Sequence, residues 1–87
     1  MASHYEIASS NHYRVQLNNY LQANGGTQRL SWGNSQDGPR HCPNWIAHAY
    51  LDGTECGRAV GRSLEQAKEE AARQVLRHIL ASKYTRS

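Results

Sequence analysis

Apolar residues recur every three or four positions in the first quarter of the chain, a spacing that predicts an amphipathic helix. We expect this helix to begin at a cap formed by Ser10 or Asn11 and to end near Ala23. The Asn24–Gly26 segment that follows contains two glycines, which favour the end of a helix. The apolar face holds Tyr13, Leu17, Tyr20 and Leu21, and the opposite face holds Val15, Gln16 and Asn19.

A second helical pattern occupies the last quarter of the chain, from a cap at Ser63 to about Leu80. Gln66 lies three residues after Ser63, which is the spacing of a capping box. Glu69 and Arg73 are four residues apart, and we expect them to pair on the exposed face. The buried stripe is predicted to contain Leu64, Ala67, Ala71, Ala72, Val75, Ile79 and Leu80.

Between the helices, residues 27–33, 45–51 and 54–61 read as three strands. Residues 34–39 are polar and contain Gly and Pro, so they are predicted to form a loop. Asp52-Gly53 is a strong signal for a tight hairpin turn between the second and third strands.

The register of that hairpin depends on the turn. A plain two-residue turn would place Arg58 on the same face as Ala47, whereas a three-residue turn or a bulge would pair Ala47 with Ala59. The second arrangement also pairs Ala49 with Gly57 and leaves Arg58 in water. We favour it because an unpaired buried guanidinium is costly.

The order helix, three strands, helix predicts an α+β domain, with both helices packed on one face of a three-stranded antiparallel sheet. The domain is expected to span residues 10–80, with flexible termini at residues 1–9 and 81–87. Trp32 and Trp45 are expected to contribute to the core.

The charge of the chain favours an anionic partner. Its 87 residues carry ten Lys and Arg against seven Asp and Glu, for a formal charge of +3, and eight of the ten bases are Arg. Arginine is well suited to phosphate because its planar fork of donors matches phosphate oxygens. No apolar run is long enough to span a membrane, and the first residues do not resemble a secretory signal.

Cysteine usage and motif content argue against catalysis. Cys42 and Cys56 are the two cysteines, without a CxxC motif, which is typical of a reducing, intracellular compartment. They would lie far apart along the sheet, so neither a shared metal nor a disulfide is expected. The HExxH, GxSxG and phosphate-loop motifs are absent from the sequence. We therefore expect a non-enzymatic protein without a cofactor or metal.

Three short segments, residues 17–22, 38–45 and 61–72, carry a resemblance to a known family. The second contains Gly-Pro-x-His followed by an aromatic residue four positions later, and the third contains Gly-x-Ser and then Ala-Lys-x-x-Ala-Ala. With the predicted element order, residues 10–80 resemble the double-stranded-RNA-binding domain. Members of that family grip one face of an A-form duplex at two minor grooves and at the phosphates between them, over about 16 base pairs.

The resemblance implies a role for each exposed segment. The first helix would contact one minor groove, the loop before the second strand would contact the next, and the start of the second helix would contact phosphates. The residues implied for these contacts are Val15, Gln16 and Asn19; Pro39, Arg40 and His41; and Arg62, Ser63 and Lys68.

The chain departs from the family pattern at the phosphate contact. Strong binders carry two lysines directly after the serine, where this chain has Leu64 and Glu65, and Asn19 replaces a common acidic residue. Two functions therefore stay open: double-stranded RNA binding, and a degenerate domain that binds a protein or forms a homodimer. The second would use the edge of the third strand or the sheet face that holds Ile46, His48, Tyr50 and Val60.

Overall fold

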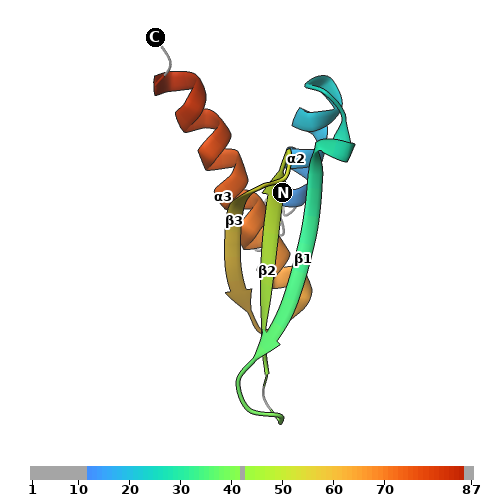
Figure 1. Cartoon of the computed structure of the whole chain (residues 1–87), viewed down its shortest axis with the longest axis vertical. Helices are drawn as coiled ribbons and strands as arrows, with labels where there is room; N and C mark the ends of the chain where they lie inside the picture. The colour runs from blue at the N-terminus through green and yellow to red at the C-terminus, as the bar shows by residue number, and fades with distance from the viewer. Residues whose placement is uncertain (1–11, 42, 86–87) are drawn as a thin grey trace, which may run out of the picture.

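The computed structural model of the chain describes residues 12–41 and 43–85. Its strands form one antiparallel sheet in the order β1-β2-β3, and both helices lie behind this sheet in Figure 1. The predicted α+β fold, with two helices on one face of three strands, is confirmed. The elements are α2 (Tyr13–Ala23), the 3₁₀ turn η1 (Thr27–Arg29), β1 (Leu30–Asp37), β2 (Asn44–Leu51), β3 (Thr54–Gly61) and α3 (Leu64–Thr85).

The first strand differs from the sequence prediction. Residues 27–29 form η1, and β1 continues through residues 34–37, which were expected to be a loop. Each residue of β1 has a partner in β2, from Leu30 with Leu51 to Asp37 with Asn44. The ladder with β2 therefore extends a strand through a polar stretch that has little strand propensity of its own.

Both helix ends also differ. The residue before α2 is His12, whose φ of 52° is left-handed, while the predicted caps Ser10 and Asn11 lie outside the described residues. α3 continues to Thr85, so residues 81–85 extend the helix beyond its predicted end near Leu80. Leu80 itself is 50% exposed, which removes it from the predicted buried stripe, and Leu64 is only partly buried.

The β2–β3 hairpin has the predicted two-residue turn with a bulge. Asp52 and Gly53 both adopt positive φ, at 53° and 85°, as this tight turn requires. The register then shifts, so that Ala47 pairs with Ala59 and Ala49 with Gly57. Arg58 is exposed, as expected from the cost of burying it.

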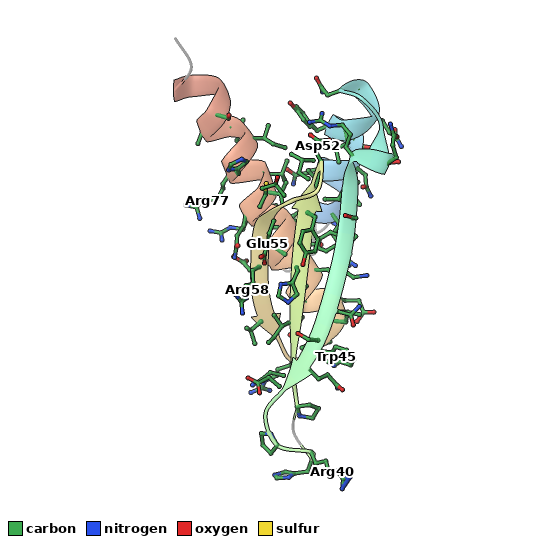
Figure 2. All side chains as sticks on the ribbon, in the orientation of Figure 1. Arg40, Trp45, Asp52, Glu55, Arg58 and Arg77 are labelled. Carbon is green, nitrogen blue, oxygen red and sulfur yellow. The ribbon has the colours of Figure 1, made fainter. Side chains whose placement is uncertain are left out.

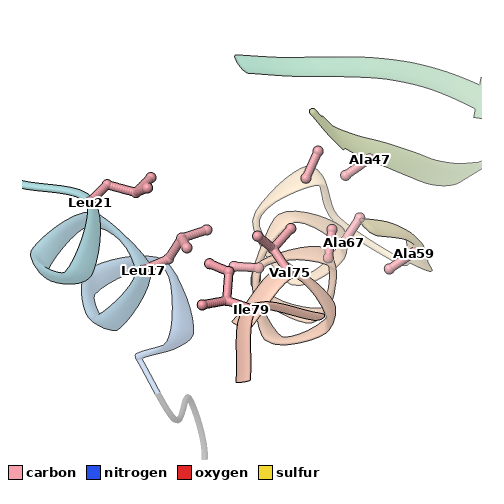
Figure 3. Packing of buried hydrophobic residues seen from close by; sticks show 10 residues of the cluster. Leu17, Leu21, Ala47, Ala59, Ala67, Val75 and Ile79 are labelled. Carbon is pink, nitrogen blue, oxygen red and sulfur yellow. The ribbon is translucent and has the colours of Figure 1, made fainter. Parts of the chain in front are cut away.

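The core is thin because small residues dominate it (Figure 3). Six of its ten buried apolar residues are alanine, and the largest fully buried side chains are Leu17, Leu21 and Val75. A Cβ added at Gly57 would lie 2.5 Å from the carbonyl oxygen of Ala71, so α3 packs directly on the backbone of β3. Trp32 and Trp45 pack against this core while partly exposed, as predicted.

Candidate nucleic-acid interface

The burial of α2 determines which of its side chains reach solvent. Leu17 and Leu21 point into the core, while Val15 is 54% exposed and Gln16 and Asn19 are exposed too. These three exposed residues lie on one side of the helix and form a mixed polar and apolar surface. This is the exposed face that the sequence predicted.

The N-terminus of α2 is held by α3. The carboxylate of Glu69 accepts hydrogen bonds from the backbone N–H groups of Tyr13 and Arg14, the latter at 3.5 Å. It also pairs with Nε of Arg14 at 3.1 Å. The predicted Glu69–Arg73 pair is therefore wrong: Arg73 pairs instead with Glu70, three residues before it, at 2.6 Å.

The other end of α2 is tied to the hairpin turn. The guanidinium of Arg29 donates to the carbonyl of Asn24, just after α2, and pairs with Asp52 at 2.8 Å. The backbone N–H of Asp52 donates to the carbonyl of Arg29 at 2.8 Å. The hydrogen bond from Arg29 lowers the pKa of the Asp52 carboxyl, and that with Asp52 raises the pKa of Arg29. α2 is thus anchored to the rest of the domain at both ends.

The loop between β1 and β2 projects from the opposite end of the sheet. Pro39, Arg40 and His41 are all exposed, and Figure 2 shows Arg40 at the tip, away from the helices. Asp37 accepts a hydrogen bond from the N–H of Gly38 at 2.8 Å, which stabilises the turn out of β1. Because β1 is longer than predicted, the ladder with β2 carries this loop to the end of the molecule.

The start of α3 is capped much as predicted. Oγ of Ser63 accepts the N–H of Gln66 at 3.2 Å, while the Gln66 side chain accepts the N–H of Arg62 instead of that of the cap residue. Arg62 and Glu65 are exposed at this end of the helix. The start of α3, where the resemblance implies a phosphate contact, therefore exposes both a positive side chain, Arg62, and a negative one, Glu65.

Lys68 is the lysine of the family pattern that this chain retains, and it contacts the sheet. Its Nζ lies 5.7 Å from the centroid of the Trp32 ring, within the range of a cation–π interaction. Trp32 belongs to β1, and its partner in β2 is the buried Ala49. The ammonium must therefore leave or share this ring in order to contact a phosphate.

The outer edge of β3 is partly covered by α3. Oε1 of Gln74 accepts the backbone N–H of Arg58 at 2.9 Å, and Gln66 satisfies that of Arg62. Strand addition needs free N–H groups along such an edge. Because these glutamines already accept two of the backbone N–H groups, they argue against a protein partner that pairs with the edge of β3.

The three predicted contact segments lie one after another along the molecule. In Figure 1, α2 is at the upper end, the β1–β2 loop is at the lower end, and α3 begins between them. The α2 helix, the start of α3 and the β1–β2 loop therefore follow one another along the long axis of the molecule (Figure 1). The sequence did not predict two contacts near these segments. Glu69, which was expected to pair with Arg73, binds the N-terminus of α2, and Trp32, which was expected only in the core, also contacts Lys68.

Within residues 12–41 and 43–85, no three His, Cys, Asp or Glu side chains gather as a metal site would require. Cys56 is a free thiol, and Cys42 lies outside the described residues. No helix in the described part of the chain is long and apolar enough to cross a bilayer.

Comparison with known proteins agrees with this geometry. Residues 13–79 match the family model of the double-stranded RNA binding motif, and this match spans α2, all three strands and most of α3. The search of curated proteins found no match. Since the match extends over most of the chain, the chain belongs to the double-stranded RNA binding motif family.

Proposed function

We propose that this domain recognises A-form RNA by shape and has no catalytic activity of its own. The family is one of double-stranded RNA binding, which sets the general function. The observation that carries the finer proposal is the docking of α2. Leu17 and Leu21 are buried, so Val15, Gln16 and Asn19 are left to meet the wide, shallow minor groove.

The other contacts follow from the same orientation. The exposed Pro39, Arg40 and His41 would meet the next minor groove, at the far end of the molecule from α2. Arg62, Ser63 and Lys68 would approach the phosphates between the two grooves, where the positive end of the α3 dipole favours negative charge. Spacing of this kind selects for the geometry of the duplex and not for its sequence.

Phosphate binding is expected to be modest. Arg40 and Arg62 are exposed, whereas Lys68 is engaged with Trp32 and Glu65 repels phosphate nearby. Three neutralised phosphates at most, from Arg40, Arg62 and Lys68, correspond to a slope no steeper than about −2 to −3 in log K against log salt. Shape-dependent contacts must then supply most of the preference for RNA.

The test is a titration of an RNA duplex of about 20 base pairs and of a DNA duplex of the same sequence, at two salt concentrations. We expect a clear preference for RNA and the shallow slope above. Equal affinity for the two duplexes would refute recognition by shape. A slope steeper than about −5 would show that another basic surface dominates.

A matched pair of histidine variants locates the contact. His41→Ala is expected to weaken RNA binding several-fold, because it removes a donor from the projecting loop. His48→Ala is the control: His48 lies on the open face of the sheet and pairs with Glu55 at 2.9 Å. If His48→Ala weakens RNA binding and His41→Ala does not, the sheet face is the interface and the proposed orientation is wrong.

A further inference from the structure

Among the described residues, helix α2 has no local side-chain cap at its N-terminus. The side chain of His12 makes no capping hydrogen bond, and the first turn contains no acidic residue. Yet the first N–H groups of any helix need acceptors, and its positive dipole end favours a carboxylate nearby. In the described part of the chain, the acceptor for these N–H groups comes from another helix.

That cap comes from Glu69 in the second turn of α3. Its carboxylate accepts the N–H groups of Tyr13 and Arg14 and also binds the Arg14 side chain, while its own side chain is only 18% exposed. A charged acceptor on backbone N–H groups makes a strong hydrogen bond, and its partial burial limits screening by salt. Glu69 thus joins two helices through residues that are 56 positions apart in sequence.

The position of Glu69 couples two of the proposed RNA contacts. It directly follows Lys68, near the start of α3, and it grips the residue before Val15 on α2. The distance and angle between the α3 start and the α2 surface are therefore set partly by one carboxylate. A rigid duplex presents its minor groove and its phosphates at fixed separation, so both surfaces must be held in register to be used together.

We infer that Glu69 is a positioning residue for RNA recognition, which acts by holding the N-terminus of α2 in register with the start of α3. The inference rests on the proposed function. It makes an unusual prediction about sign: the removal of a negative charge beside an anionic ligand should weaken binding. Simple electrostatics requires the opposite, because one fewer carboxylate should favour phosphate.

Three variants separate position from charge. Glu69→Ala removes both the acceptor and the charge, and Glu69→Gln removes the charge but keeps an acceptor for the N–H groups of α2. Glu70→Ala is the matched control, because Glu70 is adjacent to Glu69 and pairs with Arg73 on its own helix. All three variants change the net charge by the same amount.

Each variant is titrated with the RNA and the DNA duplex at one fixed salt. Unfolding is followed by circular dichroism, and hydrogen exchange is measured at the amides of Tyr13 and Arg14. For Glu69→Ala we expect about a tenfold loss of RNA affinity, the equivalent of one or two hydrogen bonds, with DNA affinity unchanged and faster exchange at both amides. Glu69→Gln and Glu70→Ala should stay within about threefold of the wild-type RNA affinity.

The outcomes are distinct. Glu69→Ala that binds RNA as well as or better than the wild type would overturn the inference, as would equal losses for RNA and DNA. If Glu69→Ala does not fold, Glu69→Gln is compared with Glu69→Leu, which removes the acceptor. The inference then requires that the ratio of RNA affinity to DNA affinity is higher for Glu69→Gln than for Glu69→Leu. A wild-type chain with no preference for RNA would refute the proposed function itself, while a wild-type preference that survives in Glu69→Ala refutes only the role of Glu69.

Discussion

Reversal of the charge of Glu65 tests whether RNA approaches the start of α3. Glu65 is the exposed second residue of that helix, where its carboxylate is favoured by the helix dipole. It occupies a position where strong binders of the family carry a lysine. If the duplex docks there, Glu65→Lys exchanges a repulsion for an attraction.

The size of the gain follows from counterion release. One additional phosphate contact changes log K by about 0.7–0.9 for each tenfold change in salt, so at about 0.1 M salt it raises affinity about five- to eightfold. Relief of the repulsion adds to this gain. The reversed charge at the helix start costs about 0.3–1 kcal/mol of folding free energy, which leaves the domain folded. The neighbouring Leu64 is kept because it packs against the core.

The assay is fluorescence anisotropy with a labelled RNA duplex at fixed salt, with circular dichroism as a check on folding. Glu65→Gln isolates the relief of repulsion from the added contact. Glu55→Lys is the matched control, since Glu55 lies near the start of β3, at the other end of that strand from the start of α3. If folded Glu65→Lys binds no tighter than the wild type, or gains no more than Glu55→Lys, RNA does not lie against α3 in the family's manner. The sheet-face alternative would then take precedence.

Two further predictions concern the framework that carries this surface. Gly57→Ala should destabilise the domain by about 1–3 kcal/mol in denaturant unfolding. The reason is that its Cβ would lie 2.5 Å from the carbonyl oxygen of Ala71 and 3.1 Å from the side chain of Val75. An unchanged denaturant midpoint would show that α3 does not pack closely on β3. The Arg29–Asp52 pair lowers the pKa of Asp52, so its contribution to stability is present above the ordinary pKa of 3.8 and is lost as the pH falls through the lower folded value. Asp52→Asn should therefore lose less stability than the wild type between neutral pH and pH values below about 4, and equal losses would contradict the pairing.

Much of the architecture could be predicted because local signals agree with the final packing. The apolar spacing of Leu17 and Leu21 determines the buried face of α2, and the same spacing leaves Val15 in water. Asp52-Gly53 requires a tight turn, and the cost of burying Arg58 selects the bulged register. The candidate contact residues were instead proposed from the resemblance to the family, and most of them are exposed in the structure.

Other features depended on partners distant in sequence. Residues 34–37 have weak strand propensity, yet they form the end of β1 because β2 offers a matching row of hydrogen-bonding groups. Residues 27–29 turn as η1, with Arg29 bound to Asp52 across 23 residues. Propensity describes a residue and its neighbours, so it carries no information about such a ladder or pair.

The sequence by itself determined the order of the elements, the faces of α2 and α3 and the hairpin register, because these follow from periodicity, turn chemistry and the cost of burying charge. Only the tertiary structure decided which partners the charged side chains near the start of α3 contact. Glu69 caps α2 instead of pairing with Arg73, and Lys68 lies over Trp32 instead of standing free. Each side chain could reach several partners, and the choice depends on how the helices cross the sheet, which no local pattern encodes.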